Sequence, residues 1–378
     1  MKKLKVIQLI PELNSGGVER GTLEVGKYLS EQGHESVVVS NGGILVDQLL
    51  REGSRHIKIP VHRKNPCSLL QVFKLKKLFI KEQPDIVHAR SRVPAWVCYL
   101  ALSGIPKRLR PRFITTVHGF YSVNPYSEIM TKGDAVICVS ESIKEYVTRN
   151  YPKVQEEKLS LIHRGISQGE FPGGFVASVS WLNNWYSQFP ETENKKLILL
   201  AGRITQLKGH EDFLKLLVGF PGKFHGLIVG SVHPKRKKYY KLLLDKTKEM
   251  KLEQRVTFAG LQSDMKEIYS LSHVALSLSS KPESFGRTIL EALSCGCPVV
   301  GYGHGGVGEI LRNCFPYGLI NLNDLDMAVS KIKNVHDLRS EITIPNFYSL
   351  NFMLKETVQA YFGTLNKNYP SLVRDSKY

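Results

Sequence analysis

The stretch Leu197–Gly209 reads Leu-Ile-Leu-Leu-Ala-Gly-Arg-Ile-Thr-Gln-Leu-Lys-Gly, an apolar run followed by a loop that carries two cations. The run predicts a buried strand, which places the loop at the strand's carboxyl end. Similar short β-branched or apolar runs lie on both sides of it, separated by segments that read as helices. This alternation predicts βαβ units and a parallel sheet covered on both faces.

The predicted strands fall into two sets. The first set is Val6–Ile10, Ser36–Ser40, His56–Pro60, Asp85–Ala89, Phe113–Val117, Asp134–Val139 and Leu159–His163. The second set is Leu197–Ala201, Phe224–Gly230, Arg255–Gly260, Val274–Ser279 and Pro298–Gly301. Between the sets, Gly165–Lys196 shows no clear period and is the candidate hinge. The sequence therefore predicts an α/β protein with two Rossmann-like, doubly wound parallel-sheet domains facing across a cleft.

Length and charge are consistent with this organisation. The chain has 378 residues, more than one core usually supports, and Lys plus Arg exceed Asp plus Glu by 52 − 34 = 18. A positive field of this size attracts phosphates, nucleic acid or an anionic membrane surface. The sequence contains no RNA-binding aromatic motif, zinc finger or helix-turn-helix signature. We therefore expect no nucleic-acid partner, although a basic nucleotide- or nucleic-acid-binding module remains the non-enzyme alternative.

The cysteines and apolar segments bear on the compartment. Six cysteines are scattered through apolar contexts without a CxxC pair, which indicates reduced core thiols in a cytoplasmic protein. The apolar run near the N-terminus ends at Pro11 and predicts a buried strand rather than an export signal. No stretch approaches the roughly 20 apolar residues that a spanning helix needs, so we expect no membrane crossing.

Three loops carry candidate chemistry. Arg203 and Lys208 suit a diphosphate whose negative charge grows as it leaves, although two exposed surface cations would give the same pattern. Glu283 and Glu291 are eight residues apart. On one helix they would differ by a rise of about 12 Å and a rotation of roughly 80°, so that both could face one extended ligand; an exposed helix face is the alternative. The pair Gly16-Gly17 lies between a strand and a helix, where backbone N–H groups can approach a phosphate, or where the chain simply turns.

Together these motifs resemble a known family. Gly202-Arg203-x-Thr205-x-x-Lys208-Gly209, then Pro282-Glu283-x-Phe285-Gly286 with Glu291, then Gly305-Gly306-Val307-Gly308-Glu309-Ile310 resemble the signature of family 4 retaining glycosyltransferases of the GT-B fold. Thr116-Val117-His118-Gly119 and Val139-Ser140-Glu141-Ser142 support the match in the first domain. Within the family, Ile10–Glu24 and Asp85–Arg92 resemble transferases of bacterial lipopolysaccharide core assembly.

The resemblance implies roles for nine residues. Arg203 and Lys208 would bind the donor diphosphate, and His118 would hydrogen-bond the transferred sugar. Glu283, with the N–H groups of Phe285 and Gly286, would bind the donor sugar and phosphate. Glu291 would hold the ribose hydroxyls, and Gly16 and Gly17 would approach the β-phosphate. The catalytic set is then His118, Glu283, Arg203 and Lys208, and the donor-binding set is Gly16, Gly17, Phe285, Gly286 and Glu291.

The resemblance also implies an activity. We expect a retaining hexosyltransferase that uses a UDP- or GDP-hexose and a glycan or lipid-linked acceptor, without cofactor or metal. Asp324-Leu325-Asp326 is interpreted as helix-start polarity rather than a metal site. Residues 1–170 would form the acceptor-binding domain and 171–349 the donor-binding domain, with a helix over 350–378 returning to the first. A nucleotide-sugar epimerase of the same fold is the alternative enzyme.

A membrane partner is the last expectation. Cys67–Lys81 combines large apolar residues with four lysines, a pattern typical of an interfacial amphipathic helix and also of an ordinary sheet-covering helix. The apolar residues include Leu69, Val72, Phe73, Leu75, Phe79 and Ile80, and the lysines are Lys74, Lys76, Lys77 and Lys81. With the net charge of +18, this pattern predicts salt-sensitive binding to anionic vesicles that weakens when Lys74, Lys76 and Lys77 become Glu. The expected location is cytoplasmic, peripheral on the inner face of the cytoplasmic membrane.

Overall fold

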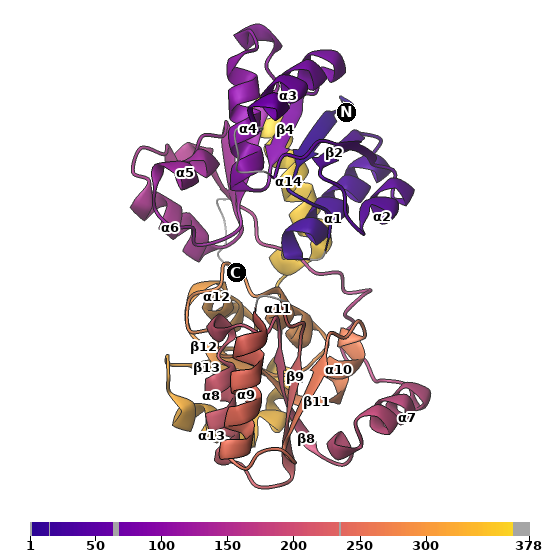
Figure 1. Ribbon diagram of the computed structural model, residues 1–378, viewed down its shortest axis with the longest axis vertical. Coiled ribbons are helices and arrows are strands. Elements are labelled where there is room, and N and C mark those ends of the chain that lie inside the picture. The colour runs from indigo at the N-terminus through magenta and orange to yellow at the C-terminus, as the bar shows by residue number, and fades with distance from the viewer. Residues whose placement is uncertain (1, 15, 63–67, 234–235, 366–378) are drawn as a thin grey trace. The chain divides into compact units, whose positions relative to one another are not determined.

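The computed structural model describes residues 2–14, 16–62, 68–233 and 236–365. The chain forms two compact units (Figure 1). Unit 1 comprises Met1–His163 together with Asn351–Tyr378, and unit 2 comprises Arg164–Leu350. Each unit is therefore described by itself.

Unit 1 is built on a seven-stranded parallel sheet of order β3-β2-β1-β4-β5-β6-β7. Its strands are β1 (Lys5–Leu9), β2 (Glu35–Ser40), β3 (Arg55–Lys58), β4 (Ile86–Ala89), β5 (Arg112–Val117), β6 (Ala135–Cys138) and β7 (Leu159–Leu161). The helices that connect or cover them are α1 (Gly17–Glu31), α2 (Val46–Arg51), α3 (Ser68–Glu82), α4 (Arg92–Ser103), α5 (Pro125–Glu128), α6 (Glu141–Asn150) and α14 (Leu350–Leu365). Strand order reverses between β1 and β4, which is the topological switch point of this sheet.

Unit 2 repeats the same winding with a six-stranded parallel sheet of order β10-β9-β8-β11-β12-β13. Its strands are β8 (Lys196–Ala201), β9 (Phe224–Val229), β10 (Val256–Gly260), β11 (Ser272–Ser277), β12 (Val299–Tyr302) and β13 (Leu319–Ile320). Its helices are α7 (Val179–Gln188), α8 (His210–Val218), α9 (Lys237–Glu249), α10 (Met265–Leu271), α11 (Arg287–Ser294), α12 (Gly305–Cys314) and α13 (Leu325–Asn334). Its switch point lies between β8 and β11.

The prediction of two doubly wound parallel-sheet domains is confirmed. Each of the twelve expected strands is present, because continuous apolar runs are what a sheet covered on both faces requires. The sequence analysis missed β13, whose two residues are too few to form a pattern. The interpretation of Gly165–Lys196 as irregular was wrong in part: α7 lies inside it, capped by Ser178, and buries Trp185 in the core of unit 2.

The cysteines lie where the sequence analysis expected them. Five of them, Cys98, Cys138, Cys295, Cys297 and Cys314, are free and buried, and burial raises the pKa of each thiol. Cys67 lies outside the described residues. Among the described helices, none combines the length and apolarity needed to cross a membrane.

Helix α3 divides its apolar residues between the core and the surface. Leu75 and Phe79 are buried, and the helix packs against α4. Leu70, Phe73 and Ile80 are 60%, 64% and 50% exposed. The sheet-covering role and an exposed apolar face therefore occur on the same helix.

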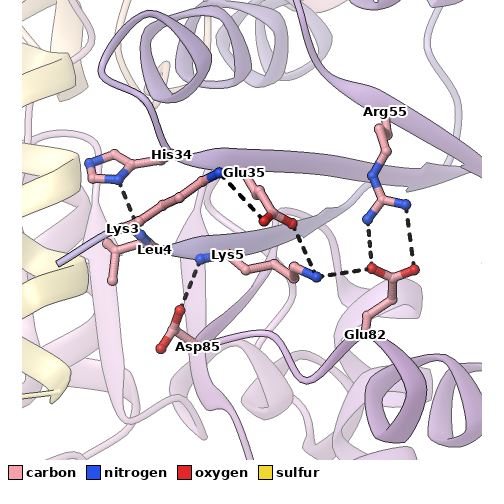
Figure 2. A network of polar contacts seen from close by, with 8 residues as sticks. All are labelled: Lys3, Leu4, Lys5, His34, Glu35, Arg55, Glu82 and Asp85. Atoms are coloured by element: carbon pink, nitrogen blue, oxygen red, sulfur yellow. Dashed lines mark hydrogen bonds and ion pairs between the residues drawn. The ribbon is translucent and has the colours of Figure 1, made fainter.

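At the amino-terminal edge of the unit 1 sheet, the charges of β1, β2 and β3 are paired (Figure 2). The Lys5 ammonium lies 3.0 Å from Glu35 and 3.4 Å from Glu82, and the Arg55 guanidinium lies 2.6 Å from Glu82. The backbone N–H of Lys5 donates to Asp85. The guanidinium of Arg55, with help from Lys5, holds the pKa of Glu82 below its usual range. Positive and negative groups therefore compensate one another at this part of the edge.

Candidate active site

The centre of the candidate site is the loop that follows β8. It carries Arg203, which is exposed, and Lys208, which lies in a one-turn 3₁₀ helix. Gly209 then has φ of +73°, and a Cβ there would lie 1.9 Å from the carbonyl oxygen of Leu278. Only glycine therefore allows this loop to pack against the end of β11.

That packing brings Lys208 to Glu283, the residue that the sequence analysis placed at the reacting sugar. The Lys208 ammonium donates to both carboxylate oxygens of Glu283 at 2.7 and 2.8 Å, and the Ser279 hydroxyl donates to the same carboxylate. Burial opposes the ionisation of Glu283, but the charge and hydrogen bonds of Lys208 and the bond from Ser279 keep its pKa below the usual range. The result is an ion pair at the switch point of unit 2.

Glycines of α12 hold the Glu283 loop in place. The N–H of Gly306 donates to the carbonyl oxygen of Glu283 at 2.8 Å. A Cβ at Gly306 would lie 2.4 Å from Cα of Phe285, and one at Gly305, where φ is +58°, would lie 2.6 Å from the Glu283 carbonyl oxygen. The imidazole of His304 lies 2.8 Å from the Ser279 carbonyl oxygen. The Gly305-Gly306 motif therefore fixes the loop that carries Glu283.

The helix geometry expected for the two glutamates was wrong. Gly286 has φ of +108° and α11 begins only at Arg287, so Glu283 lies in the preceding loop rather than on the helix. Glu291 lies one turn into α11 and is buried, with Arg287 Nε 3.0 Å and the Tyr269 hydroxyl 3.3 Å from its carboxylate.

In unit 1, Gly16 and Gly17 stand at the N-terminus of α1, directly after β1 and its loop. A Cβ at Gly16 would lie 2.4 Å from the carboxylate of Glu19, whereas a Cβ at Gly17 would meet no atom within 4 Å. Gly17 is exposed. There is therefore space beside Gly17 on the side where a side chain would stand, and a ligand can come close to the backbone there.

His118 follows β5 and is held by an aromatic clamp. Its backbone N–H donates to the Tyr121 hydroxyl at 3.3 Å, and the Tyr121 carbonyl oxygen accepts from the Tyr146 hydroxyl. The Arg92 guanidinium lies over the Tyr121 ring, 4.6 Å from its centroid. The loop position of His118 is therefore set by packing around Tyr121.

Arg90 is a candidate site residue that the sequence analysis did not assign. It directly follows β4 at the switch point of unit 1 and is buried. Its Nε donates to Gln8 at 2.8 Å, and burial lowers its pKa. Its Nη2 has no hydrogen-bond partner within the part of the chain that the structure describes. Fully buried arginines are rare, so the burial of Arg90 marks it as a candidate functional residue in the structure. The sequence alone does not show which arginines are buried.

Over the described ranges, no group of three or more His, Cys, Asp or Glu side chains has the arrangement of a metal site. Asp324 instead caps α13, accepting a hydrogen bond from the N–H of Met327 at 3.0 Å. Its interpretation as helix-start polarity is therefore confirmed.

Comparison with known proteins identifies the two halves separately. Residues 15–169 match the family model described as Glycosyltransferase Family 4, and residues 183–341 match the one described as Glycosyl transferases group 1. A glycosyltransferase from Rickettsia africae ESF-5, known as a crystal structure, is 31% identical. It aligns over 98% of this chain and 100% of its own, with a TM-score of 0.85.

Two curated relatives also align over both halves. The N-acetyl-alpha-D-glucosaminyl L-malate synthase of Bacillus anthracis is 27% identical, over 88% of each chain. The UDP-Gal:alpha-D-GlcNAc-diphosphoundecaprenol alpha-1,3-galactosyltransferase of Escherichia coli is also 27% identical, over 89% of this chain and 88% of its own. With its two doubly wound units and these matches, the chain belongs to the GT-B glycosyltransferases that join a Glycosyltransferase Family 4 half to a Glycosyl transferases group 1 half.

Proposed function

We propose that this glycosyltransferase moves a hexose from a UDP- or GDP-sugar, bound by unit 2, to a glycan or lipid-linked acceptor, with retention of anomeric configuration. The observation that carries the proposal is the Lys208–Glu283 pair at the switch point between β8 and β11. Open α/β sheets bind nucleotides at such points, outside the carboxyl ends of their strands. The pair combines a mobile cation for phosphate with a carboxylate for sugar hydroxyls.

In the donor complex, the partners of this pair would change. Lys208 and the exposed Arg203 would bind the diphosphate, whose charge increases as the bond to the sugar breaks. Glu283, released from Lys208 but still bonded to Ser279, would accept hydrogen bonds from the sugar. The acceptor hydroxyl would attack the face from which the nucleotide leaves, and the departing phosphate would take its proton. Glu283 is therefore a positioning and electrostatic group in this proposal.

The remaining site residues would bind around this centre. The N–H groups of Phe285 and Gly286, at the start of α11, would face the donor phosphate. Glu291 already interacts with Arg287 and Tyr269, but an ionised carboxylate can accept about four hydrogen bonds and can also take a ribose hydroxyl. In unit 1, Gly16 and Gly17 would approach the β-phosphate and His118 the transferred sugar.

The acceptor proposal rests on the relatives and on unit 1. By their names, the two curated relatives use malate and a diphosphoundecaprenol-linked sugar, both anionic acceptors. The segments Ile10–Glu24 and Asp85–Arg92 resemble lipopolysaccharide core transferases, which supports a role in that pathway. We place the enzyme on the cytoplasmic face of the inner membrane, and we propose that no metal takes part.

One experiment tests the activity. The protein is incubated with a panel of UDP- and GDP-hexoses, in EDTA, with or without truncated lipopolysaccharide core as acceptor. We expect nucleoside diphosphate to be released only with acceptor, and the proton NMR coupling of the product to show the donor's anomeric configuration. Conversion of the donor into its epimer would support an epimerase instead. An inverted product would refute retention, and a strict need for added metal would refute metal independence.

A separate experiment tests the membrane proposal. Phe73 and Ile80 on α3 are exposed beside Lys74 and Lys77, whereas the Lys76 ammonium packs against Gly104 at the end of α4. Replacing Lys74 and Lys77 by Glu should reduce co-sedimentation with phosphatidylglycerol vesicles at low salt by several-fold, since each lysine near such a surface contributes about 1 kcal/mol. Replacing Lys27 and Arg51 by Glu, on α1 and α2, is the charge-matched control. Equal loss in both variants would refute a specific role for α3.

A further inference from the structure

Unit 1 contains a cavity of about 500 Å³ at the amino-terminal end of β5 and β6. Its walls come from the end of α4, from residues 107–113 and from Lys132 and Asp134. His118 follows the other end of β5. Six residues of strand span roughly 16–20 Å, so this cavity is separate from the candidate site at the carboxyl ends.

The lining of the cavity is strongly cationic. It contains Lys107, Arg108, Arg110, Arg112 and Lys132 against a single carboxylate, Asp134. Asp134 already accepts a hydrogen bond from the N–H of Phe113 at 2.8 Å. The carboxylate is therefore occupied in part by the backbone.

Two of the five cations have partners in the protein. The Arg110 guanidinium donates to the carbonyl oxygens of Ile105 and Ser103, which caps the C-terminal end of α4. Lys132 lies 2.5 Å from Glu128. Lys107, Arg108 and Arg112 have no ion-pair partner among the described residues. Three cations thus line one cavity without a carboxylate of their own.

The other half of the same sheet edge shows that the fold does not require this excess. At the amino ends of β1, β2 and β3, Lys5 and Arg55 are each paired with Glu35 or Glu82 (Figure 2). Like charges held close together repel, and this repulsion is relieved when an anion binds between them. An anion bound in the cavity would therefore offset positive charge that no carboxylate of its own offsets at this half of the edge.

We propose that this cavity is a second anion site, which binds a ligand bearing a phosphate monoester or diester. Arg108 and Arg112 can each present a planar fork to phosphate oxygens, and Lys107 adds a mobile charge. Tyr99, which lines the cavity, and the neighbouring Leu109 are 40% and 55% exposed. An apolar rim beside a cationic cavity matches a glycerophospholipid head group, whereas a free phosphate needs the cations alone. The proposal does not depend on the chemistry in unit 2.

The test uses a soluble phosphate and vesicles as probes, with two cavity variants and one charge-matched control variant of the whole chain. Binding of glycerol 3-phosphate is measured by calorimetry, and co-sedimentation is measured with phosphatidylglycerol and phosphatidylcholine vesicles. Arg108→Ala with Arg112→Ala should weaken phosphate binding at least tenfold. Lys107→Ala with Arg108→Ala, both exposed, gives the same test without touching the half-buried Arg112. Lys27→Ala with Arg51→Ala removes two charges elsewhere in unit 1 and should leave binding unchanged.

The outcomes separate the source of the phosphate. If the cavity variants lose glycerol 3-phosphate binding but keep the vesicle binding of the wild type, the ligand is a free phosphate. If they also lose the preference for phosphatidylglycerol over phosphatidylcholine vesicles, the ligand is a lipid head group. UDP binding, measured in parallel, should be the same in all variants. The proposal is overturned if the wild-type chain binds neither probe, if the cavity variants bind both probes as well as the wild type does, or if the Lys27/Arg51 control loses as much binding as the cavity variants.

Discussion

The six strands of unit 2 and the first six strands of unit 1 follow one order, 3-2-1-4-5-6 in each unit's own numbering, and unit 1 adds a seventh strand. The residues at the two switch points differ in how their charges are paired. In unit 2, Lys208 and Glu283 are paired, and glycines without room for a Cβ fix the loops that carry them. In unit 1, a Cβ at Gly17 would meet no atom within 4 Å, and one nitrogen of the buried Arg90 has no hydrogen-bond partner among the described residues. Topology therefore sets where a site can form, and the local residues decide whether its charges are already compensated.

This difference gives the first and largest prediction. Lys208→Ala should lower kcat/KM by roughly tenfold to a thousandfold, the range for losing one preorganised electrostatic contact. The control is Lys215→Ala, an exposed lysine on α8 whose partner Asp212 lies three residues away. Steady-state kinetics with both variants provide the measurement. Unchanged turnover in Lys208→Ala would remove this lysine from the site.

The two glutamates should give different kinetic defects. Glu283→Gln should mainly lower kcat, because this carboxylate is placed at the reacting sugar, while Glu291→Gln should mainly raise KM for the donor. Because Glu291 also binds Arg287, thermal unfolding of both variants is needed to separate affinity from stability. The same kinetic defect in both variants would contradict the division of roles.

The glycine-fixed loops of unit 2 predict a stability effect. Gly306→Ala should destabilise unit 2 by about 1–3 kcal/mol, because the new Cβ would lie 2.4 Å from backbone atoms of Phe285. Gly222→Ala is the matched control, since a Cβ there meets no atom within 4 Å. Urea unfolding followed by tryptophan fluorescence compares the two. Equal urea midpoints for the two variants would show that the Glu283 loop can shift to accommodate the new Cβ without loss of stability.

Unit 1 should show an effect of similar size at Tyr361. Its hydroxyl, on α14, lies 2.8 Å from Nδ1 of His88, whose Nε2 lies 2.7 Å from the Thr116 hydroxyl. Tyr361→Phe leaves the buried His88 without this partner and should cost about 1–3 kcal/mol. Tyr28→Phe, on α1, is the control, since the Tyr28 hydroxyl makes no hydrogen bond with the residues that the structure describes. Unfolding of unit 1 can be followed by hydrogen exchange of β4 and β5.

The sequence was sufficient for the sheets but not for every part of the sites. Apolar runs predicted the strands because burial on both faces imposes a continuous pattern. The Lys208 and Glu283 motifs were recognised, and their contact depends on Gly209 and Gly306, whose steric role appears only when the chain is folded. The prediction that Glu283 and Glu291 lie on one helix was wrong, because Gly286 adopts a positive φ and α11 begins only at Arg287.

The last prediction concerns acid stability and compares His225 with the rest of unit 2. His225 is buried on β9, and burial lowers its pKa to about 4. Its Nε2 lies 2.8 Å from the hydroxyl of Thr257, which itself donates to Glu191, so Nε2 must carry the hydrogen. Lys195 and Arg255 are the nearby cations that oppose a charge on the ring.

The sign follows from the two states. Between about pH 6.5 and pH 4 the unfolded chain binds a proton that folded His225 does not, so stability falls as pH falls through this window. The loss of unfolding free energy that His225 causes between pH 7 and pH 5 is about 2 kcal/mol.

In His225→Gln the side-chain amide can still donate to Thr257 but cannot take up a proton. We expect the variant to match the wild type near pH 7 and to lose less stability by pH 5, as measured by urea unfolding with the fluorescence of Trp185. His210, buried with a pKa also lowered to about 4, remains in both proteins, so acid sensitivity should be reduced rather than abolished. Identical stability profiles for the two proteins between pH 7 and pH 5 would show that His225 takes up its proton as readily in the folded unit as in the unfolded chain.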